Sequence, residues 1–309
     1  DTLITDYLNL YEEKFEPLKN EEIPNVNIFL IEDNYLNYYK LNNYGYFFPR
    51  KEMFNIIESL NFSIEEMKNP PKLVFIDYDL HYTELPYGRK ISLNDKLLID
   101  ELIKLSSYSV VLIPKAKRFH FIENYLTEKG ITNKNIIFVS PNFLVSNDLQ
   151  SRRFQSYYKD NDKIYPNVDY LMYLLSKKEC NIFDEINNLK EMNGGINLCN
   201  DRLNKFNITS NRIIPKLFIN NTNNDYNYGY TLWDKTSSFQ KIRSVSTLVE
   251  ESVVPSSLED SIIIIGGAFS GNDDKIAIAH TLSSNTIKIP GVIMHLNALN
   301  SFYFFDGTL

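Results

Sequence analysis

Apolar and polar residues form two alternating kinds of segment along the first half of the chain. Short apolar runs have the length of buried strands, and they cover residues 26–31, 72–80, 108–113 and 135–140. Between these runs, apolar residues recur every three or four positions, as in amphipathic helices, over residues 50–62, 92–105 and 117–129. A repeated strand–helix–strand order favours parallel strands. We therefore expect an α/β fold with a largely parallel central sheet and flanking helices.

Individual residues mark two of the expected helix ends. Ser92 is followed three positions later by Asp95, which is the spacing of a helix N-cap with a reciprocal partner. Gly130 follows the third helical segment directly, and glycine commonly terminates a helix. The second helix should therefore begin near Ser92, and the third should end at Gly130.

The middle third of the chain carries weaker patterns. Within it, we expect a helix, a strand and an exposed Asn-, Tyr- and Gly-rich loop, at residues 168–176, 212–219 and 220–230 respectively. We interpret residues 1–309 as a single domain. Residues 143–241 form an irregular insertion, or a less regular subregion, within that domain.

The two ends of the chain give clearer patterns. Residues 1–15 have the spacing of an amphipathic helix. Residues 261–267 indicate a central strand that runs into a glycine turn, and a terminal helix is expected after Gly291.

Composition restricts the class of protein. The chain has 309 residues, 43% of them hydrophobic, and a net charge of -7. It is too apolar to be disordered, and it lacks the surplus of positive charge that binding to nucleic acid phosphates requires. No apolar run approaches the roughly 18 residues that span a bilayer, and no signal peptide is present, so we interpret the chain as a fragment of a longer protein.

Two cysteines allow one disulfide bond. Cys180 and Cys199 are the only cysteines, which is too few for a disulfide scaffold. Their spacing permits one bridge in an oxidising compartment. The alternative is two unpaired thiols.

Two carboxylates follow the second expected strand. Asp77 and Asp79 would lie at the carboxyl end of a parallel strand, where ligands bind in α/β sheets. This strand with its Asp-x-Asp ending, together with Asn272, Asp273 and Asp274, resembles the haloacid-dehalogenase-like phosphatases, which use Mg²⁺. The resemblance is incomplete, because His81 and Pro114 stand where that family has other residues. We keep a Mg²⁺-dependent phosphatase as the alternative, beside the simpler interpretation that these acids bond backbone amides.

Other catalytic and metal motifs are incomplete. The spacing of Gly266 and Gly271 matches a phosphate loop, but Asn272 and Asp273 stand where its lysine and its Ser or Thr would be. Ser270 lacks the glycine pattern of a serine hydrolase. The histidines have no paired spacing and neither cysteine has a Cys-x-x-Cys partner, so we expect no metal site and no cofactor.

Several segments, taken in order, resemble the CHASE2 family, an extracytoplasmic sensor domain of bacterial transmembrane receptors. Residues 27–33 are similar to its strand ending in an acid, and residues 46–50 to its aromatic-Pro-Arg step. Residues 73–79 are similar to its second strand with a terminal Asp. The next expected helix and strand, through residue 113, also resemble the family.

The end of the chain carries the most specific resemblance. The string Pro-Gly-Val-x-x-His-x-Asn-Ala-Leu at residues 290–299 is similar to the family's closing signature. Leu296 replaces its usual small residue, Ile289 a frequent Met, and His280 a frequent Pro. The matches extend over roughly residues 25–305, with the middle third unmatched.

The resemblance implies a receptor topology. It implies a periplasmic domain of an inner-membrane protein, with a transmembrane helix before it and several after it. It also implies coupling to a cytoplasmic effector such as a histidine kinase or a nucleotide cyclase, with no enzymatic activity in this fragment. The expected partners are an unknown small ligand or periplasmic factor and a second copy in a homodimer, with no nucleic acid.

The site residues expected for such a sensor lie mainly at the carboxyl edge of the sheet. They are Asp33, Arg50, Asp77, Asp79, Gly266, Gly267 and His295. Arg50 can pair with an anionic ligand group or, more simply, with Asp77 in a buried ion pair. His295 can instead form a hydrogen bond within the core. A third interpretation is a purely structural, partner-binding domain of an envelope complex.

Overall fold

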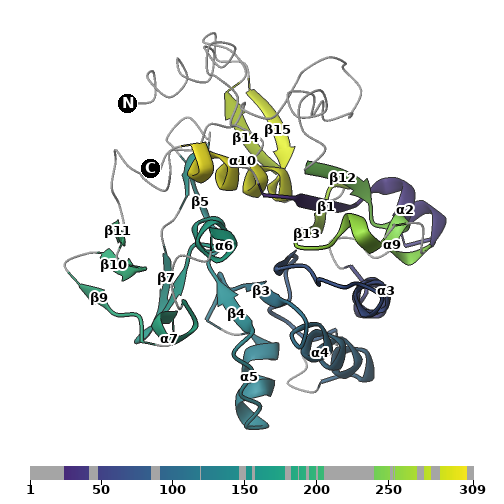
Figure 1. Cartoon of the computed structure of the whole chain (residues 1–309), viewed down its shortest axis with the longest axis horizontal. Helices are drawn as coiled ribbons and strands as arrows, with labels where there is room; N and C mark the ends of the chain where they lie inside the picture. Colours follow the sequence, from purple (N-terminus) through teal and green to yellow (C-terminus); the bar gives the residue numbers. More distant parts are fainter. Residues whose placement is uncertain are drawn as a thin grey trace. The chain divides into compact units, whose positions relative to one another are not determined.

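The computed structural model divides the chain into two compact units (Figure 1). One unit comprises Asn25–Val139 and Ile242–Asp273, and the other comprises Asp1–Pro24, Ser140–Lys241 and Asp274–Leu309. Each unit is described by itself. The structure describes residues 24–41, 48–84, 91–118, 120–145, 151–154, 157–177, 182–186, 188–192, 195–199, 201–204, 240–250, 253, 255–269, 275–279 and 286–304.

A six-stranded parallel sheet forms the centre of the first unit, which confirms the expected α/β fold. Its order is β12-β1-β13-β2-β3-β4. These strands are β1 (Val26–Ile31), β2 (Leu73–Asp77), β3 (Val110–Pro114), β4 (Ile136–Val139), β12 (Gln240–Ser244) and β13 (Ile262–Gly267). Strand β13, from near the end of the chain, lies between β1 and β2: Ile264 is in register with Ile28 on one side and with Phe75 on the other.

The central strands of the sheet are buried on both of their faces. All six residues of β1 and all six of β13 are buried, which explains why their sequences are continuous apolar runs rather than alternating ones. The four predicted strands of the first half of the chain and the late one at 261–267 are therefore confirmed, with small shifts at their ends.

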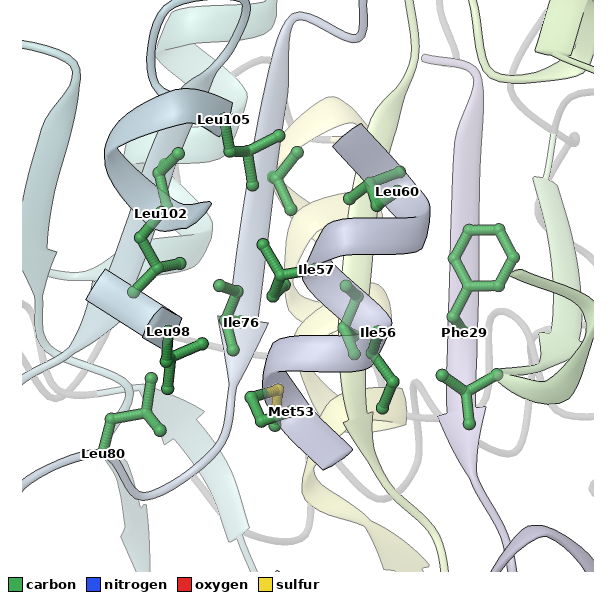
Figure 2. Close-up of a cluster of buried hydrophobic side chains, with 14 of the residues drawn as sticks. Phe29, Met53, Ile56, Ile57, Leu60, Ile76, Leu80, Leu98, Leu102 and Leu105 are labelled. Carbon is green, nitrogen blue, oxygen red and sulfur yellow. The ribbon is translucent and has the colours of Figure 1, made fainter. Parts of the chain in front are cut away.

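Two amphipathic helices pack against one another over the sheet. They are α3 (Arg50–Glu65) and α4 (Leu93–Leu105). Figure 2 shows their apolar side chains meeting those of the strands, and the labelled residues are Phe29, Met53, Ile56, Ile57, Leu60, Ile76, Leu80, Leu98, Leu102 and Leu105. Each such buried side chain contributes about 1.5–3 kcal/mol relative to its exposed state.

Both predicted helix ends are confirmed. Ser92 and Asp95 form a capping box at the start of α4. Gly130 has a φ of 64°, which is the left-handed conformation that glycine adopts without strain. One boundary differs, because α5 (Phe121–Glu128) begins four residues after the predicted start at residue 117. The amides of Ala116 and Lys117 donate to a histidine instead of joining a helix.

Further short elements complete the first unit. Helix α2 (Asp33–Tyr38) follows β1, and α9 (Ser246–Val249) lies against α3. A 3-10 turn, η4 (Pro255–Ser257), precedes β13. Their buried residues Tyr35, Leu36 and Leu248 extend the hydrophobic core.

In the second unit, α6 (Val168–Lys177) packs against α10 (Gly291–Phe304). The helices predicted at 168–176 and after Gly291 are therefore confirmed. Short antiparallel pairs accompany them: β5 (Phe143–Val145) with β6 (Ser151–Phe154), β7 (Tyr157–Asp160) with β8 (Lys163–Pro166), and β14 (Lys275–Ala279) with β15 (Thr286–Pro290). Strands β9 (Glu191–Met192), β10 (Gly195–Leu198) and β11 (Asp201–Asn204) form a small sheet, and α7 (Ile182–Ile186) precedes it.

Aromatic rings fill the contact between α6 and α10. The ring centroids of Tyr170 and Phe302 are 5.2 Å apart, and those of Tyr173 and Phe302 are 5.9 Å apart. The predicted helix at 1–15, the strand at 212–219 and the loop at 220–230 lie outside the described residues. Among the helices that the structure describes, none has both the length and the apolar character needed to cross a bilayer.

Candidate functional site

The carboxyl ends of β1, β13 and β2 lie together, as expected for neighbouring parallel strands. Gly266 is in register with Asp77 on one side and Leu30 on the other, and Gly267 is in register with Ile31. Asp33 follows β1 as the first residue of α2, and its side chain is exposed. Four of the predicted site residues therefore share one edge of the sheet.

The segment after β2, residues 78–84, is held to its surroundings by polar contacts, and we call it the β2 loop. At its start, the Tyr78 hydroxyl accepts a hydrogen bond from the backbone amide of Phe48 at 2.6 Å. Burial raises the pKa of Tyr78 to about 12, although the bond from Phe48 opposes the shift. This hydroxyl therefore stays protonated, and it fixes the start of the loop near the N-terminus of α3.

Arg50 holds the middle of the β2 loop. Its Nη2 donates to the carbonyl oxygen of Tyr82 at 2.5 Å, and its guanidinium lies 5.4 Å from the ring centroid of Phe121. Its Nε lies 3.5 Å from Oδ1 of Asp95, an ion-pair separation without a hydrogen bond from Nε. Burial lowers the pKa of Arg50, and the Asp95 carboxylate opposes this. Arginine stays charged in proteins, so this is a buried ion pair.

The buried ion pair predicted for Arg50 is therefore present, but its partner is Asp95 rather than Asp77. Asp95 is fully buried, and its carboxylate also accepts hydrogen bonds from the backbone amides of Glu84 and Ser92. The same carboxylate thus caps α4, neutralises Arg50 and holds the end of the β2 loop. The Glu84 carboxylate in turn accepts from the side chains of Ser92 and Asn94.

Asp79 and His81 form a pair within the β2 loop. Oδ1 of Asp79 accepts from the backbone amide of His81 at 2.9 Å and lies 2.6 Å from the Nδ1 of its ring. Oδ2 accepts from the Nζ of Lys117 at 3.1 Å. Burial alone would raise the pKa of Asp79, but these contacts with His81 and Lys117 outweigh it, and the pKa is lowered.

His81 connects three elements of the unit. Its Nε2 accepts hydrogen bonds from the backbone amides of Ala116 and Lys117, at 3.0 Å and 3.2 Å. Its carbonyl oxygen accepts from the amide of Phe121 at the start of α5. Because Nε2 acts as an acceptor, the proton of the neutral ring is on Nδ1 and is donated to Asp79. His81 therefore joins the β2 loop to the β3 loop, residues 115–118, and to α5.

A second histidine lies beside His81. The ring centroids of His81 and His120 are 4.9 Å apart, and His120 is fully buried next to Phe138. Within the described part of the chain, neither of its ring nitrogens has a hydrogen-bond partner. Burial is the main cause that lowers the pKa of His120 to about 3, and the neighbouring His81 and Lys115 lower it further. His120 is therefore neutral under ordinary conditions, and its unpaired nitrogens destabilise the fold.

Lys115 is a buried residue of the β3 loop, and its side chain holds the loop to α5. Only 2% of its side chain is exposed, and its Nζ lies 2.6 Å from a carboxylate oxygen of Glu123 on α5. The same Nζ donates to the carbonyl oxygen of Arg118 at 2.9 Å. The β3 loop is thus fixed to α5 independently of its contacts with His81.

His295 belongs to the other unit and lies on α10. Its Nδ1 is 2.8 Å from Oδ1 of Asp169 on α6, and both side chains are buried. Burial raises the pKa of Asp169, and His295 opposes this shift. Asn167 caps α6, because its Oδ1 accepts from the amides of Asp169 and Tyr170. The hydrogen bond within the core that we considered for His295 is therefore present.

The geometry argues against two catalytic roles. Asp79 is occupied by His81 and Lys117, and its lowered pKa opposes the protonated state that a general acid needs. The Nε2 of His81 is occupied by two amides, so it is not free to take a proton from a nucleophile. Within the described part of the chain, no group of three or more His, Cys, Asp or Glu side chains is arranged for a metal ion. Asp273 and Asp274 lie outside the described residues.

Sequence reasoning missed three residues of this arrangement: His81, Asp95 and Lys117. Asp95 was predicted only as a cap, and His81 was noted only as a departure from a phosphatase pattern. The Asp-x-His spacing of Asp79 and His81 is the one local signal, because it allows an Asx turn in which both residues meet.

Cys199 is disulfide-bonded. The chain has one other cysteine, Cys180, which lies outside the described residues. In the described part, the amide of Cys199 donates to a carboxylate oxygen of Glu185 at 2.7 Å.

The chain matches no protein-family model, no curated protein and no solved structure.

Proposed function

We propose that the chain is the extracytoplasmic signal-input domain of a bacterial transmembrane receptor. In this proposal it lies in the periplasm, anchored to the inner membrane by flanking segments, and biases a cytoplasmic effector. Its stimulus is an unknown small ligand or a periplasmic factor. A stimulus shifts a conformational equilibrium only as far as its affinity for the two conformations differs.

The observation that carries the proposal is the adjacency of β1, β13 and β2. Strands β1 and β2 contain the segments that resemble the first and second strands of CHASE2 domains, and β13 contains residues 262–266, which resemble the part of that family that precedes its closing signature. They come from opposite ends of the chain, yet they pair in register with their carboxyl ends together. A resemblance that arose by chance would have no reason to fall on three neighbouring strands, whereas a shared fold would produce this result.

The β2 loop supports a regulatory rather than a catalytic role for this edge. Besides the buried side chain of Leu80, it is held by polar contacts from Arg50, Asp95 and the β3 loop. A hydrogen bond contributes about 0.5–1.5 kcal/mol between neutral groups and about 1.5–3 kcal/mol to a charged group, so a ligand or a partner that offers equivalent bonds can replace these contacts. The loop is therefore suited to having two arrangements.

The disulfide at Cys199 supports the proposed compartment. Disulfides persist in the periplasm and in other oxidising environments, and they are rare in the cytosol.

The test is the complete reading frame from which this chain comes. We expect apolar spans of about 20 residues on either side of it, followed by a cytoplasmic output domain. Polar flanks without any span would contradict the proposal. The effect of a β2-loop variant on the output of the full-length protein, measured against that of a distant surface variant, then tests whether this edge is the input.

A further inference from the structure

We propose that the β2 loop is an acid-sensitive switch. A proton taken up at Nε2 of His81 breaks the hydrogen bonds that this nitrogen accepts from the amides of Ala116 and Lys117 in the β3 loop. The physiological meaning of this inference rests on the proposed function, because protons would then be one of the signals read. The protonation of His81 and the loss of its amide contacts do not depend on the proposed function.

The switch follows from the roles of the two ring nitrogens. In the observed arrangement Nδ1 faces Asp79, and Nε2 accepts from the amides of Ala116 and Lys117. A proton bound to Nε2 would turn an acceptor into a donor that faces two other donors. The protonated ring must therefore leave the two amides. It can keep its bond to Asp79, because that bond uses the other nitrogen.

The surroundings allow the ring to leave toward solvent. His81 is buried, but the Asp79 side chain is 52% exposed and the Lys117 side chain is 49% exposed. Asp79 therefore provides an anionic partner at the surface for the imidazolium. The β3 loop keeps its own support after release, since Lys115 remains bonded to Glu123 and to the Arg118 carbonyl.

Charged groups on the neighbouring elements act on this equilibrium. Asp79 lies 2.6 Å from Nδ1 and favours the imidazolium. Lys115 and Lys117 on the β3 loop oppose it, and so does Arg50 on α3, which binds the Tyr82 carbonyl next to His81. His120 is uncharged in the closed arrangement, because burial lowers its pKa.

His120 makes the release more cooperative. Its ring lies 4.9 Å from that of His81, and both of its nitrogens lack partners. If release of His81 admits water to this position, His120 regains hydrogen bonds and can bind a proton as well. The regained hydrogen bonds favour the open arrangement at any pH, and the bound proton favours it further as the pH falls.

The test is hydrogen exchange at single amides of the 309-residue chain, measured by NMR at pH 7.5 and pH 5.0 and expressed as protection factors. If the released ring binds one proton that the closed ring does not, the opening equilibrium can change by up to about tenfold per pH unit. We therefore expect the protection factors of Ala116 and Lys117 to fall by at least about tenfold, while that of Leu112 in β3 changes much less. Equal protection at both pH values would overturn the proposal.

His81→Gln is the matched variant, because the Gln side-chain oxygen can accept the same amides but does not titrate. We expect it to abolish the pH dependence at Ala116 and Lys117, and we expect His120→Phe, which retains His81, to preserve it. The same pH dependence in His81→Gln would overturn the switch. If that variant does not fold, the ¹⁵N shifts of the His81 ring in the unaltered chain decide: they must show an unprotonated Nε2 and a proton on Nδ1 at pH 7.5, and a proton on Nε2 at that pH would overturn the switch. If the switch is absent, the proposed receptor topology can still hold, because the reading frame tests that topology separately.

Discussion

The side chain of His81 accepts a hydrogen bond from the backbone amide of Ala116 at 3.0 Å. This contact joins the segments that follow two neighbouring strands, β2 and β3, which are also joined by the ion pair of Lys117 with Asp79. It also fixes the tautomer of the ring, because an acceptor nitrogen carries no proton. The protonation state of His81 therefore decides whether the two buried amide contacts between the β2 loop and the β3 loop are present.

Replacing Arg50 should destabilise the chain strongly. Arg50→Ala removes the partner of the fully buried Asp95 carboxylate, and breaking a buried pair in this way costs about 3–5 kcal/mol. Denaturant unfolding measures this loss. The control is Lys104→Ala, which removes an ion pair with Glu65 in which both side chains are 42% exposed, and should cost less than about 1 kcal/mol. A loss from Arg50→Ala as small as that of the control would show that the pair contributes little.

His120→Phe should stabilise the chain, and the gain should increase with acidity. The substitution removes two unpaired buried nitrogens and keeps an aromatic ring beside Phe138, so we expect about 1 kcal/mol at pH 7.5. The native pKa of His120 is lowered to about 3, so between that value and about 6.5 the unfolded chain binds the additional proton and acid destabilises the native state.

Comparing urea unfolding of His120→Phe and the unaltered chain at two pH values tests this linkage. Between pH 7.5 and pH 5.5 the difference in unfolding free energy should grow by about 1.4 kcal/mol. A constant difference would mean that His120 is not the neutral, buried group described above.

The pair of Asp169 and His295 should behave as a structural contact of the second unit. His295→Phe leaves the buried Asp169 carboxylate without this partner and should cost about 3–5 kcal/mol. His295→Gln can still donate a hydrogen bond to Asp169, so we expect a smaller loss of about 1–2 kcal/mol. Thermal or urea unfolding of both variants gives the comparison. Equal losses would indicate that packing, rather than the bond to Asp169, is what the substitution removes.

The disulfide should join Cys199 to Cys180. Peptide mapping under non-reducing conditions should yield one linked pair of peptides that contain these residues, and reduction should separate them. Loss of the bond should lower the free energy of unfolding by about 3 kcal/mol, as expected for a closed loop of this size. Two free thiols in protein purified from an oxidising compartment would contradict the assignment.

The sequence predicted the sheet well because buried parallel strands and amphipathic helices have distinct periodicities. Asp77, Gly266 and Gly267 were expected at one edge, since the carboxyl ends of parallel strands meet there, and their register agrees. The position of β13 between β1 and β2 was not predictable, because the order of strands depends on long-range pairing that local patterns do not encode.

Individual contacts of the site were less predictable than its location. Arg50 was expected to pair with Asp77 or a ligand, but the start of α4 brings Asp95 to it instead. A single histidine has no periodicity, so nothing in the sequence assigned His81 to the amides of the β3 loop. His295 was grouped with the sheet edge, yet its partner, Asp169, is on α6 of the other unit.

The most direct test of the proposed receptor is the side of the membrane on which this domain lies. Leu93 is 72% exposed, and Cys199 is disulfide-bonded and therefore unreactive toward maleimides. In the full-length protein, Leu93→Cys should react with a membrane-impermeant maleimide in intact cells, whereas Leu98→Cys, at a fully buried position, should not. Labelling of Leu93→Cys only after the cells are lysed would contradict an extracytoplasmic signal-input domain.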